Sequence, residues 1–289
     1  MQALPGRPWW RFASVSVALF LTACHPRPEA GAVPPAYEVA AVRFATIAGF
    51  PVRALVAGAD TSRRMDIAMM VWPLRAPSGG IVLVDAGFTR QKFIAQWKPR
   101  DYVTPDSALR AAGYDAARVT DIVISHIHWD HADGVDQFPQ ARIWLQRAEF
   151  EAYVGAQGEP LQPAIDSGVA VLFRRLHNEG RVRLIDGDDR EILPGIRVHT
   201  GGKHTVASQF VSVRTAQGVA VITSDNAYLY ENLEQHRPIA QTLDSVSNLA
   251  AQRRMLALAA RPSMVLPGHD PAVFTRLGEV RPGVARLGK

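Results

Sequence analysis

The sequence predicts a mixed α/β domain with more than one β-sheet. The chain has 289 residues, 47% of them hydrophobic and 20% charged, which is typical of a globular protein with a full core. Short apolar runs that end at Gly or Asp predict strands. Some of these runs follow one another directly and others are separated by helical segments, which favours more than one sheet.

The N-terminal segment predicts an export signal. The basic leader MQALPGRPWWR precedes FASVSVALFLTA, whose 12 apolar or small residues are too few to span a bilayer but suit a signal peptide. The stretch ends at Cys24, the chain's single cysteine. This pattern resembles a bacterial lipoprotein signal, in which the chain is cleaved before the cysteine and the cysteine is lipidated. A plain secretory signal with an incidental cysteine is the alternative.

We therefore expect three segments: a lipoprotein signal peptide at residues 1–23, a Pro-rich tether at 24–36 and one folded domain at 37–289. The tether is predicted to be extended because residues 25–36 contain four prolines. The protein would be exported and lipid-anchored in the cell envelope. His25, which stands where an acid would signal retention, favours the periplasmic side of the outer membrane by analogy with that class.

The first half of the domain predicts strands and helices in turn. Residues 37–46 and 64–75 read as half-buried strands, and 80–87 as a strand that is buried on both faces. Helical patterns follow at 89–98 and 104–113, with Gly113 as a stop signal. Further elements are predicted as a strand at 121–125, a strand at 141–146 and a helix at 147–154.

The second half predicts mainly strands. Residues 155–180 are less regular and read as a loop followed by a helix. Strands are predicted at 181–186, 195–200, 208–215 and 218–225, then a helix at 245–260 and a strand that enters a loop at 263–270. We expect Glu231 and Asn232 to begin a helix.

The segment SHIHWDH, residues 125–131, gathers metal-binding side chains. His126 and His128 are two apart, so in an extended segment both rings project to the same side. Asp130 and His131 follow a turn and can face a second position nearby. With Cys24 acylated, no thiolate is left to bind metal, and the site must be built from His and carboxylate ligands. A solvated polar loop is the alternative.

Three further candidates stand where predicted strands run into loops. They are His204, Asp225 and His269. Taken singly, each is more often an ordinary surface or core residue than a ligand. Loops at strand ends are common places for functional sites, and together the three favour the ligand interpretation.

These residues resemble the motif set of the metallo-β-lactamase superfamily. The family's His-x-His-x-Asp-His, His, Asp and His occur in order at 126–131, 204, 225 and 269, and VDAG at 84–87 is similar to its early strand end. The resemblance implies a four-layer αββα sandwich with two mixed sheets and the metal site at their edge.

The segment SDNAYLYEN, residues 224–232, resembles N-acyl-homoserine lactonases in particular. The resemblance implies two divalent metal ions, zinc first, with iron, manganese or cobalt as alternatives. One ion would be held by His126, His128 and His204. The second would be held by Asp130, His131 and His269, and Asp225 would bridge the two.

The implied reaction is the opening of a small-molecule lactone by a metal-bridging hydroxide. Two ions could lower the pKa of a shared water towards ~7. Tyr228 would donate a hydrogen bond to the substrate, and Asp130 would pass a proton to the leaving alkoxide. Asp85 would orient a ligand histidine.

Several alternatives stay open at this point. Another hydrolase of the same fold, acting on β-lactams, thioesters or phosphoesters, is one, and a non-catalytic metal-binding lipoprotein is another. The lack of a cysteine ligand excludes the Cys-type β-lactamases. The formal charge of +5 without a dense basic run excludes nucleic acid as the expected partner. The only expected membrane contact is through lipidated Cys24, and an oligomer is left open.

Some conspicuous side chains are expected to be structural. Three histidines, His177, His199 and His236, are assigned no ligand role. A core strand is favoured over an acyl-chain pocket for Met65, Met69, Met70 and Trp72.

Overall fold

The computed structural model describes residue 2 and residues 34–288. The expected cleavage site, Cys24 and most of the tether lie outside the described residues. No helix in the described part has the length and apolar character that a membrane crossing requires.

Two mixed sheets form the centre of the domain. The larger has eight strands in the order β12-β13-β1-β2-β3-β4-β5-β6, and the smaller has five in the order β11-β10-β9-β8-β7. The larger sheet consists of β1 (Glu38–Pro51), β2 (Arg64–Arg75), β3 (Ile81–Val84), β4 (Val119–Val123), β5 (Arg142–Gln146), β6 (Val182–Ile185), β12 (Glu279–Arg281) and β13 (Val284–Arg286). The smaller consists of β7 (Arg190–Leu193), β8 (Ile196–Thr200), β9 (Gln209–Thr215), β10 (Gly218–Ser224) and β11 (Val265–Pro267).

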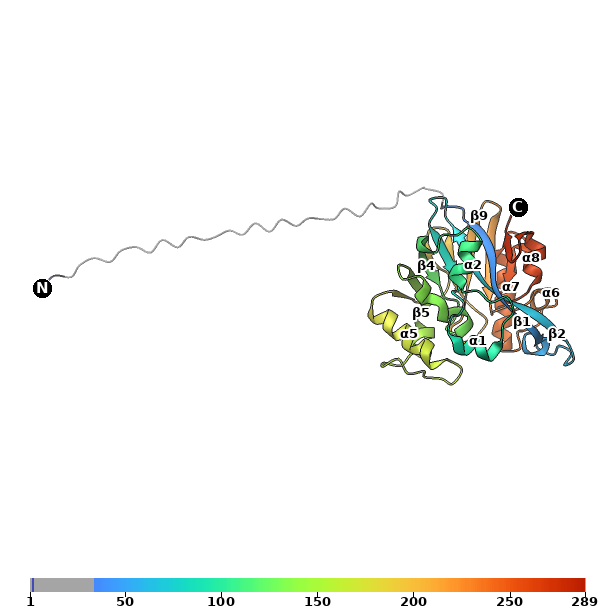
Figure 1. Cartoon of the computed structure of the whole chain (residues 1–289), viewed down its shortest axis with the longest axis horizontal. Coiled ribbons are helices and arrows are strands. Elements are labelled where there is room, and N and C mark those ends of the chain that lie inside the picture. Colours follow the sequence, from blue (N-terminus) through green and yellow to red (C-terminus); the bar gives the residue numbers. More distant parts are fainter. Residues whose placement is uncertain (1, 3–33, 289) are drawn as a thin grey trace. The chain divides into compact units, whose positions relative to one another are not determined.

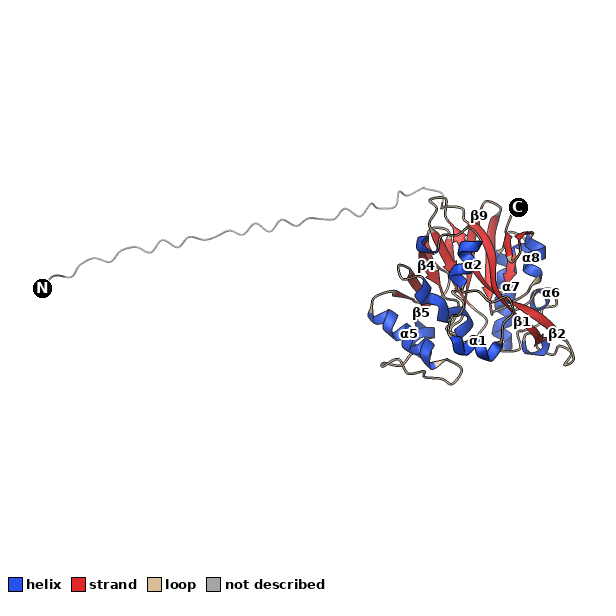
Figure 2. Ribbon diagram, viewed as in Figure 1, coloured by secondary structure: helices blue, strands red, loops and turns tan. Residues whose placement is uncertain are grey.

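Helices cover the outer faces, as Figure 2 shows, so the fold has the four αββα layers expected from the resemblance. They are α1 (Gln91–Trp97), α2 (Pro105–Ala111), α3 (Trp129–Ala132), α4 (Arg147–Tyr153), α5 (Ser167–Asn178), α6 (Tyr230–Glu234), α7 (Ser245–Leu258) and α8 (Ala272–Leu277). One apolar core joins the large sheet to α1, α2, α4 and α5. The second fills the space between the sheets and extends to α7 and α8.

The position of β1 and β2 between layers corrects one expectation. Both were expected to be half-buried, yet the consecutive residues Val39–Val42 of β1 and Ile67–Leu74 of β2 are buried, because helices cover one face and the second sheet covers the other. Successive side chains of β2 point to opposite faces of the sheet, so they alternate between the helix-side core and the core between the sheets. Met69 belongs to the helix-side core, and Met70 and Trp72 belong to the core between the sheets.

The site is placed by strand ends that meet at one edge. β3 and β4 are parallel, as are β10 and β11, so the carboxyl ends of each pair lie together. Strand β4, labelled in Figure 1, ends at Val123, three residues before His126. Asp85 follows β3, Asp225 follows β10 and His269 lies two residues after β11. The fold thereby collects residues that are far apart in the sequence.

His199 is a buried core residue on β8, as its place in the strand alternation predicts. Its Nε2 lies 2.8 Å from Ser212 Oγ, and its Nδ1 lies 3.2 Å from an Arg254 nitrogen. Burial, helped by the charge of Arg254, lowers the pKa of His199 from 6.5 to about 4. The ring is therefore neutral in the folded protein at pH values where it is charged in the unfolded chain.

We expect His199 to make the protein sensitive to mild acid. Between pH 6.5 and about 4 the unfolded chain binds a proton that the folded state excludes, so the free energy of unfolding falls as the pH drops through this window. His199→Gln keeps polar bonding capacity without titrating and should lose less stability over the same range. Urea unfolding at about pH 7 and about pH 4.5 measures the difference. Parallel losses in the two proteins would contradict this assignment.

Candidate metal centre

The motif segment changes from extended chain to helix between its ligands. After β4 the chain bends at Ser125, and His128, whose backbone is extended, precedes the single turn of α3. His126 and His128 therefore project together, and the turn carries Asp130 and His131 to a neighbouring position. This is the arrangement of the four residues that the sequence predicts.

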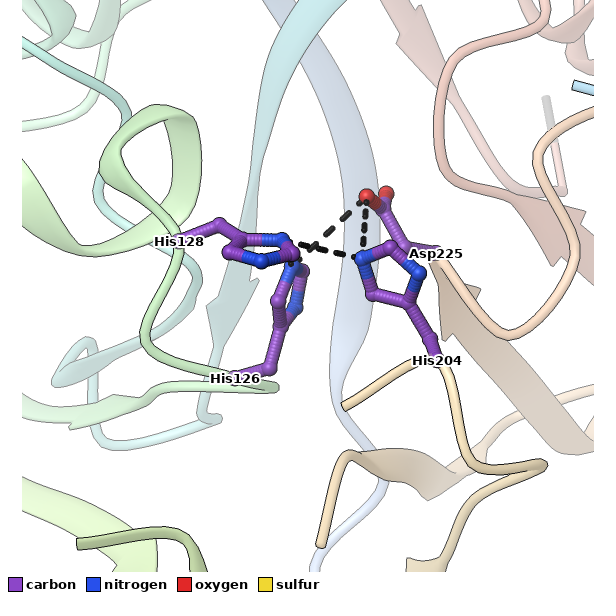
Figure 3. Close-up of side chains that lie close together, drawn as sticks. All are labelled: His126, His128, His204 and Asp225. Atoms are coloured by element: carbon purple, nitrogen blue, oxygen red, sulfur yellow. Dashed lines mark hydrogen bonds and ion pairs between the residues drawn. The ribbon is translucent and has the colours of Figure 1, made fainter. Parts of the chain in front are cut away.

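The first group of ligands, which we call the three-His cluster, consists of His126, His128 and His204. Nδ1 of His128 lies 3.0 Å from Nε2 of His126 and 3.0 Å from Nε2 of His204. Figure 3 shows the three rings, from two different loops, turned toward one another. Nitrogens around a tetrahedral zinc at ~2.05 Å would be ~3.3 Å apart, so this spacing suits a metal ion.

The second group, which we call the Asp-His cluster, consists of Asp130, His131 and His269. Asp130 Oδ2 lies 3.5 Å from His131 Nε2 and 3.8 Å from His269 Nε2. The backbone before His269 packs closely against the end of β10. A Cβ on Gly268 would lie 2.7 Å from the Ser224 carbonyl. Only glycine allows the loop of His269 to come so near the end of β10.

Asp225 lies between the two clusters and turns one oxygen toward each. Its Oδ2 is 3.3 Å from His204 Nε2 and 3.6 Å from His126 Nε2. Its Oδ1 is 3.2 Å from His131 Nε2 and 2.9 Å from His269 Nε2. This is the arrangement that a carboxylate needs to bridge two ions.

The hydrogen bonding supports a fit to metal. Among the described residues, His131 Nε2 and Asp225 Oδ1 are buried polar atoms without a hydrogen-bond partner, which is costly unless something else binds them. In each group of four that includes Asp225, the candidate ligand atoms lie within 4.8 Å of one another. Nitrogen and oxygen donors that face a common point, not one another, are the chemistry of a metal site.

Bonds on the far side of the histidines fix their orientation. His131 Nδ1 lies 2.8 Å from Asp85 Oδ2, which is the contact expected of a carboxylate that orients a candidate ligand histidine. Asp85 also accepts from Ser125 N at 2.8 Å and from Ser224 Oγ at 2.8 Å. Asp85 and Ser224 have φ of 59° and 47°, and such left-handed backbone is often found at functional sites.

Backbone carbonyls orient two more rings. His204 Nδ1 lies 2.8 Å from the Gln241 carbonyl, and His269 Nδ1 lies 3.0 Å from the Ala68 carbonyl. A carbonyl only accepts, so Nδ1 of each ring carries a proton. In the neutral form of each ring the lone pair is then on Nε2, which faces the cluster. Sequence could not identify these partners, because any residue supplies a carbonyl.

Electrostatics distinguish the two clusters. Burial, together with the neighbouring imidazoles, lowers the pKa of His126 and takes that of His128 to about 4; burial also lowers the pKa of His204. These rings are neutral and ready to bind metal at neutral pH. For His131 and His269 burial acts to lower the pKa, but the charges and hydrogen bonds of the nearby carboxylates, Asp225 first among them, together outweigh it and raise the pKa of both. Metal binding at the Asp-His cluster would release protons.

A cavity of about 120 Å³ opens onto both clusters. Its polar wall includes His128, Asp130, His204, Asp225, His269, Tyr228 and Gln241. Its apolar wall includes Ile47, Phe50, Leu55, Ile67, Met69 and Trp97. Met69, which we expected to be a core residue only, thus also lines the cavity.

One buried acid near the site could not be recognised from the sequence. Glu149 on α4 is 0% exposed and accepts hydrogen bonds from Ile127 N, Thr205 Oγ1 and Ala207 N. It lies in no motif, and the helix pattern RAEFEAYV gives no sign that a charged residue faces inward. By contrast, Glu231 and Asn232 lie within the helix expected for them.

A two-sheet αββα sandwich with two adjoining His/Asp clusters at one edge defines a class of protein built to hold a pair of metal ions. The chain belongs to the Metallo-beta-lactamase superfamily, whose family model matches residues 68–269. The matched region contains all seven candidate ligands.

Proteins that are similar to this chain in sequence include N-acyl homoserine lactonases. One from a Bacillus species is 32% identical over 165 residues, which cover 56% of this chain and 60% of the relative. AttM from Rhizobium johnstonii, also an N-acyl homoserine lactonase, is 27% identical over 58% of this chain and 64% of its own length. The chain thus matches about three fifths of the length of these relatives.

Solved structures show the same fold. A quorum-quenching N-acyl homoserine lactone lactonase superposes with a TM-score of 0.66 at 21% identity, covering 82% of this chain and 93% of its own. AidC, a dizinc quorum-quenching lactonase, superposes with a TM-score of 0.61 at 14% identity, covering 89% and 99%. At these identities the likeness establishes the fold.

Proposed function

We propose that the protein is a metal-dependent hydrolase that opens lactone rings, with N-acyl-homoserine lactones as its first candidate substrates. The cavity carries this proposal, because it brings both ligand clusters, a tyrosine hydroxyl and an apolar wall to one place. The relatives support it: one solved AiiA variant from B. thuringiensis holds N-decanoyl-L-homoserine at its active site. We propose zinc as the metal.

The two ions, when bound, would acidify a water to near neutrality and polarise the substrate carbonyl. The chain itself would bind the substrate and handle its protons. The apolar wall, which includes Phe50, Ile67 and Met69, would remove the acyl chain from water. The charged edge of the cavity would hold the lactone ring.

Tyr228 would donate a hydrogen bond to the substrate. Its hydroxyl lies 3.2 Å from His204 Nδ1, whose proton is directed to the Gln241 carbonyl. A protonated ring nitrogen cannot accept, so the hydroxyl proton of Tyr228 is free for a substrate oxygen. Burial and the charges of Asp225 and Asp130 raise the pKa of Tyr228 well above 10, which keeps this proton in place at neutral pH.

Asp130 would move a proton between the attacking water and the leaving alkoxide. Burial acts to raise the pKa of Asp130, but the charge and hydrogen bond of His131, together with the charge of His269, outweigh it, and the net pKa is lowered. The group is therefore a carboxylate at neutral pH that can accept a proton. Its side chain is 16% exposed and lines the cavity, so a substrate can reach it.

Tyr228→Phe should lower kcat by roughly 10²-fold, because the substrate oxygen that becomes negative in the transition state loses the hydrogen bond from the buried hydroxyl. Metal content should stay the same, since the hydroxyl is not among the ligands. Tyr230→Phe is a matched control: Tyr230 is equally buried, 4% exposed against 4%, but does not line the cavity. Steady-state kinetics of both variants test the role, and equal rates for Tyr228→Phe and the wild type would exclude it.

The substrate class is tested with the purified protein. Acid release is followed with homoserine lactones of several acyl lengths, in parallel with a β-lactam, a thioester and a phosphoester. Turnover of lactones above the other classes is expected. Faster turnover of the β-lactam, the thioester or the phosphoester would show that the protein hydrolyses that type of bond and is not a lactonase. Two bound ions without turnover of any of them would favour a non-catalytic metal-binding protein.

We also propose that the domain is exported and anchored through a lipid on Cys24, as the N-terminal sequence predicts. An anchored enzyme of the cell envelope would meet lactone signals in transit. Mass spectrometry of the mature protein is expected to find a lipid-modified N-terminal Cys24. A mature protein cleaved elsewhere and without lipid would exclude the anchor.

A further inference from the structure

Glu149 stands out as a buried carboxylate that the proposed reaction does not use. It projects from α4, is 0% exposed, and does not line the cavity beside the clusters. A charged group is costly to bury unless it is well bonded. Burial raises the pKa of Glu149 to about 7, even though bonds from Thr205, Ala207 and Ile127 act to lower it.

The partners of Glu149 come from two loops that are distant in sequence. Its Oε1 accepts from Ile127 N at 3.2 Å and from Thr205 Oγ1 at 2.7 Å, and its Oε2 accepts from Ala207 N at 2.8 Å. Ile127 stands between His126 and His128, and Thr205 directly follows His204. One carboxylate thus joins the two loops that supply the three-His cluster.

A second residue of α4 strengthens this connection. Tyr153, one turn after Glu149, accepts a hydrogen bond from Val206 N at 3.1 Å through its hydroxyl. Helix α4 therefore holds three consecutive residues after His204, namely Thr205, Val206 and Ala207. The bond from His204 Nδ1 to Gln241 orients the ring, but it does not set the distance between the two loops.

We propose that Glu149 is a positioning residue of the three-His cluster, which sets the separation of the loop of His126 and His128 from the loop of His204. The proposal rests on the metal site of the proposed function, not on its substrate. Asp130, His131 and His269 make no hydrogen bond to Glu149, so the Asp-His cluster should not depend on it.

Glu149→Gln is the variant that tests this role. An amide group keeps the shape of the carboxylate but has only one acceptor oxygen, so its NH₂ must face Ala207 N–H or Ile127 N–H. The loop of His204 then loses one of its two bonds to residue 149, or the loop of His126 and His128 loses its only one. We expect this to displace the ring nitrogens of the three-His cluster.

Zinc affinity is measured by competition with a chromophoric chelator in two backgrounds. In Asp130→Ala/His269→Ala only the three-His cluster can bind, and there Glu149→Gln should weaken zinc binding ~10- to 100-fold, as for other groups that orient metal ligands. In His126→Ala/His128→Ala only the Asp-His cluster is left, and there the affinity should not change. Equal weakening in both backgrounds, or in neither, would overturn the proposal.

Two further variants keep the test decisive. Asp121→Asn is the matched control, because Asp121 is another buried acid, 2% exposed, but bonds Arg142 and Trp144 on β5. A loss of zinc affinity equal to that of Glu149→Gln would show a general effect of removing a buried charge and overturn the proposal. If Glu149→Gln does not fold, Thr205→Val removes one donor to Glu149, and unchanged zinc affinity in the first background would overturn the proposal.

The readout is separate from catalysis. If the wild type binds two zinc ions and opens no lactone, the proposed substrate is wrong while the selective effect of Glu149→Gln on zinc is still expected. If lactones are opened but Glu149→Gln leaves zinc binding unchanged, the positioning role is wrong and the hydrolase proposal stands.

Discussion

Asp225→Ala should abolish hydrolysis and reduce the bound metal to one ion or none. Asp225 turns one oxygen toward each cluster, and its removal would leave each ion with one ligand fewer and with no carboxylate to bridge the pair. The loss of activity should exceed the ~10- to 100-fold that follows removal of a group that only orients a ligand. Elemental analysis and a lactone assay on the same preparation measure the two effects together.

Asp133→Ala is the matched control for this experiment. Asp133 is 2% exposed and follows His131 by two residues, but its bonds go to Thr89 and Arg90. It belongs to neither cluster. Its removal should lower stability while two ions stay bound. Full activity and two ions in Asp225→Ala would contradict the bridging role.

Removal of metal should abolish activity and lower the melting temperature by on the order of 10 °C. The folded state alone presents the seven ligands together, so metal in ~1,000-fold excess over its dissociation constant adds about 4 kcal/mol to stability. For a domain of this size each kcal/mol corresponds to ~2–4 °C. Calorimetry with and without a chelator measures the shift.

Added zinc should restore both activity and melting temperature, because the effect is one of binding and not of damage. Asp225→Ala provides the comparison, since its melting temperature should respond much less to the chelator. A wild-type melting temperature that is the same with and without chelator would show that the clusters hold no structural metal.

The candidate ligands could be predicted from sequence because the information is local. Within SHIHWDH, the alternation of His126 and His128 and the turn before Asp130 decide which side chains lie together. His204, Asp225 and His269 could be placed because each follows a strand, and strand ends meet at a sheet edge. Strand β2 was likewise predicted with its observed bounds, 64–75, since its apolar run is long and ends clearly.

What could not be predicted depends on contacts between distant parts of the chain. The Ala68 and Gln241 carbonyls orient two ligand rings, and the identity of a residue says nothing about where its carbonyl points. Glu149 resembles any surface acid on a helix until the loops of Ile127 and Ala207 are seen around it. The short strands β12 and β13 have only three residues each and carry no usable pattern.

The same reason explains the wrong burial of β1 and β2. Both were interpreted as half-buried strands, with one face in contact with solvent, which is usual for an antiparallel pair. The second sheet covers that face, and only the tertiary fold determines this. The wrong burial of β1 and β2 did not affect the prediction of the seven candidate ligands, because that prediction depends on where strands end and not on which faces are covered.

The most direct test of the central claim is a crystal structure of the protein grown with zinc, with anomalous scattering recorded at the zinc edge. We predict two anomalous peaks ~3.5–4 Å apart, one among His126, His128 and His204, the other among Asp130, His131 and His269, with Asp225 between them. A single peak, or none at these residues with zinc supplied, would contradict it.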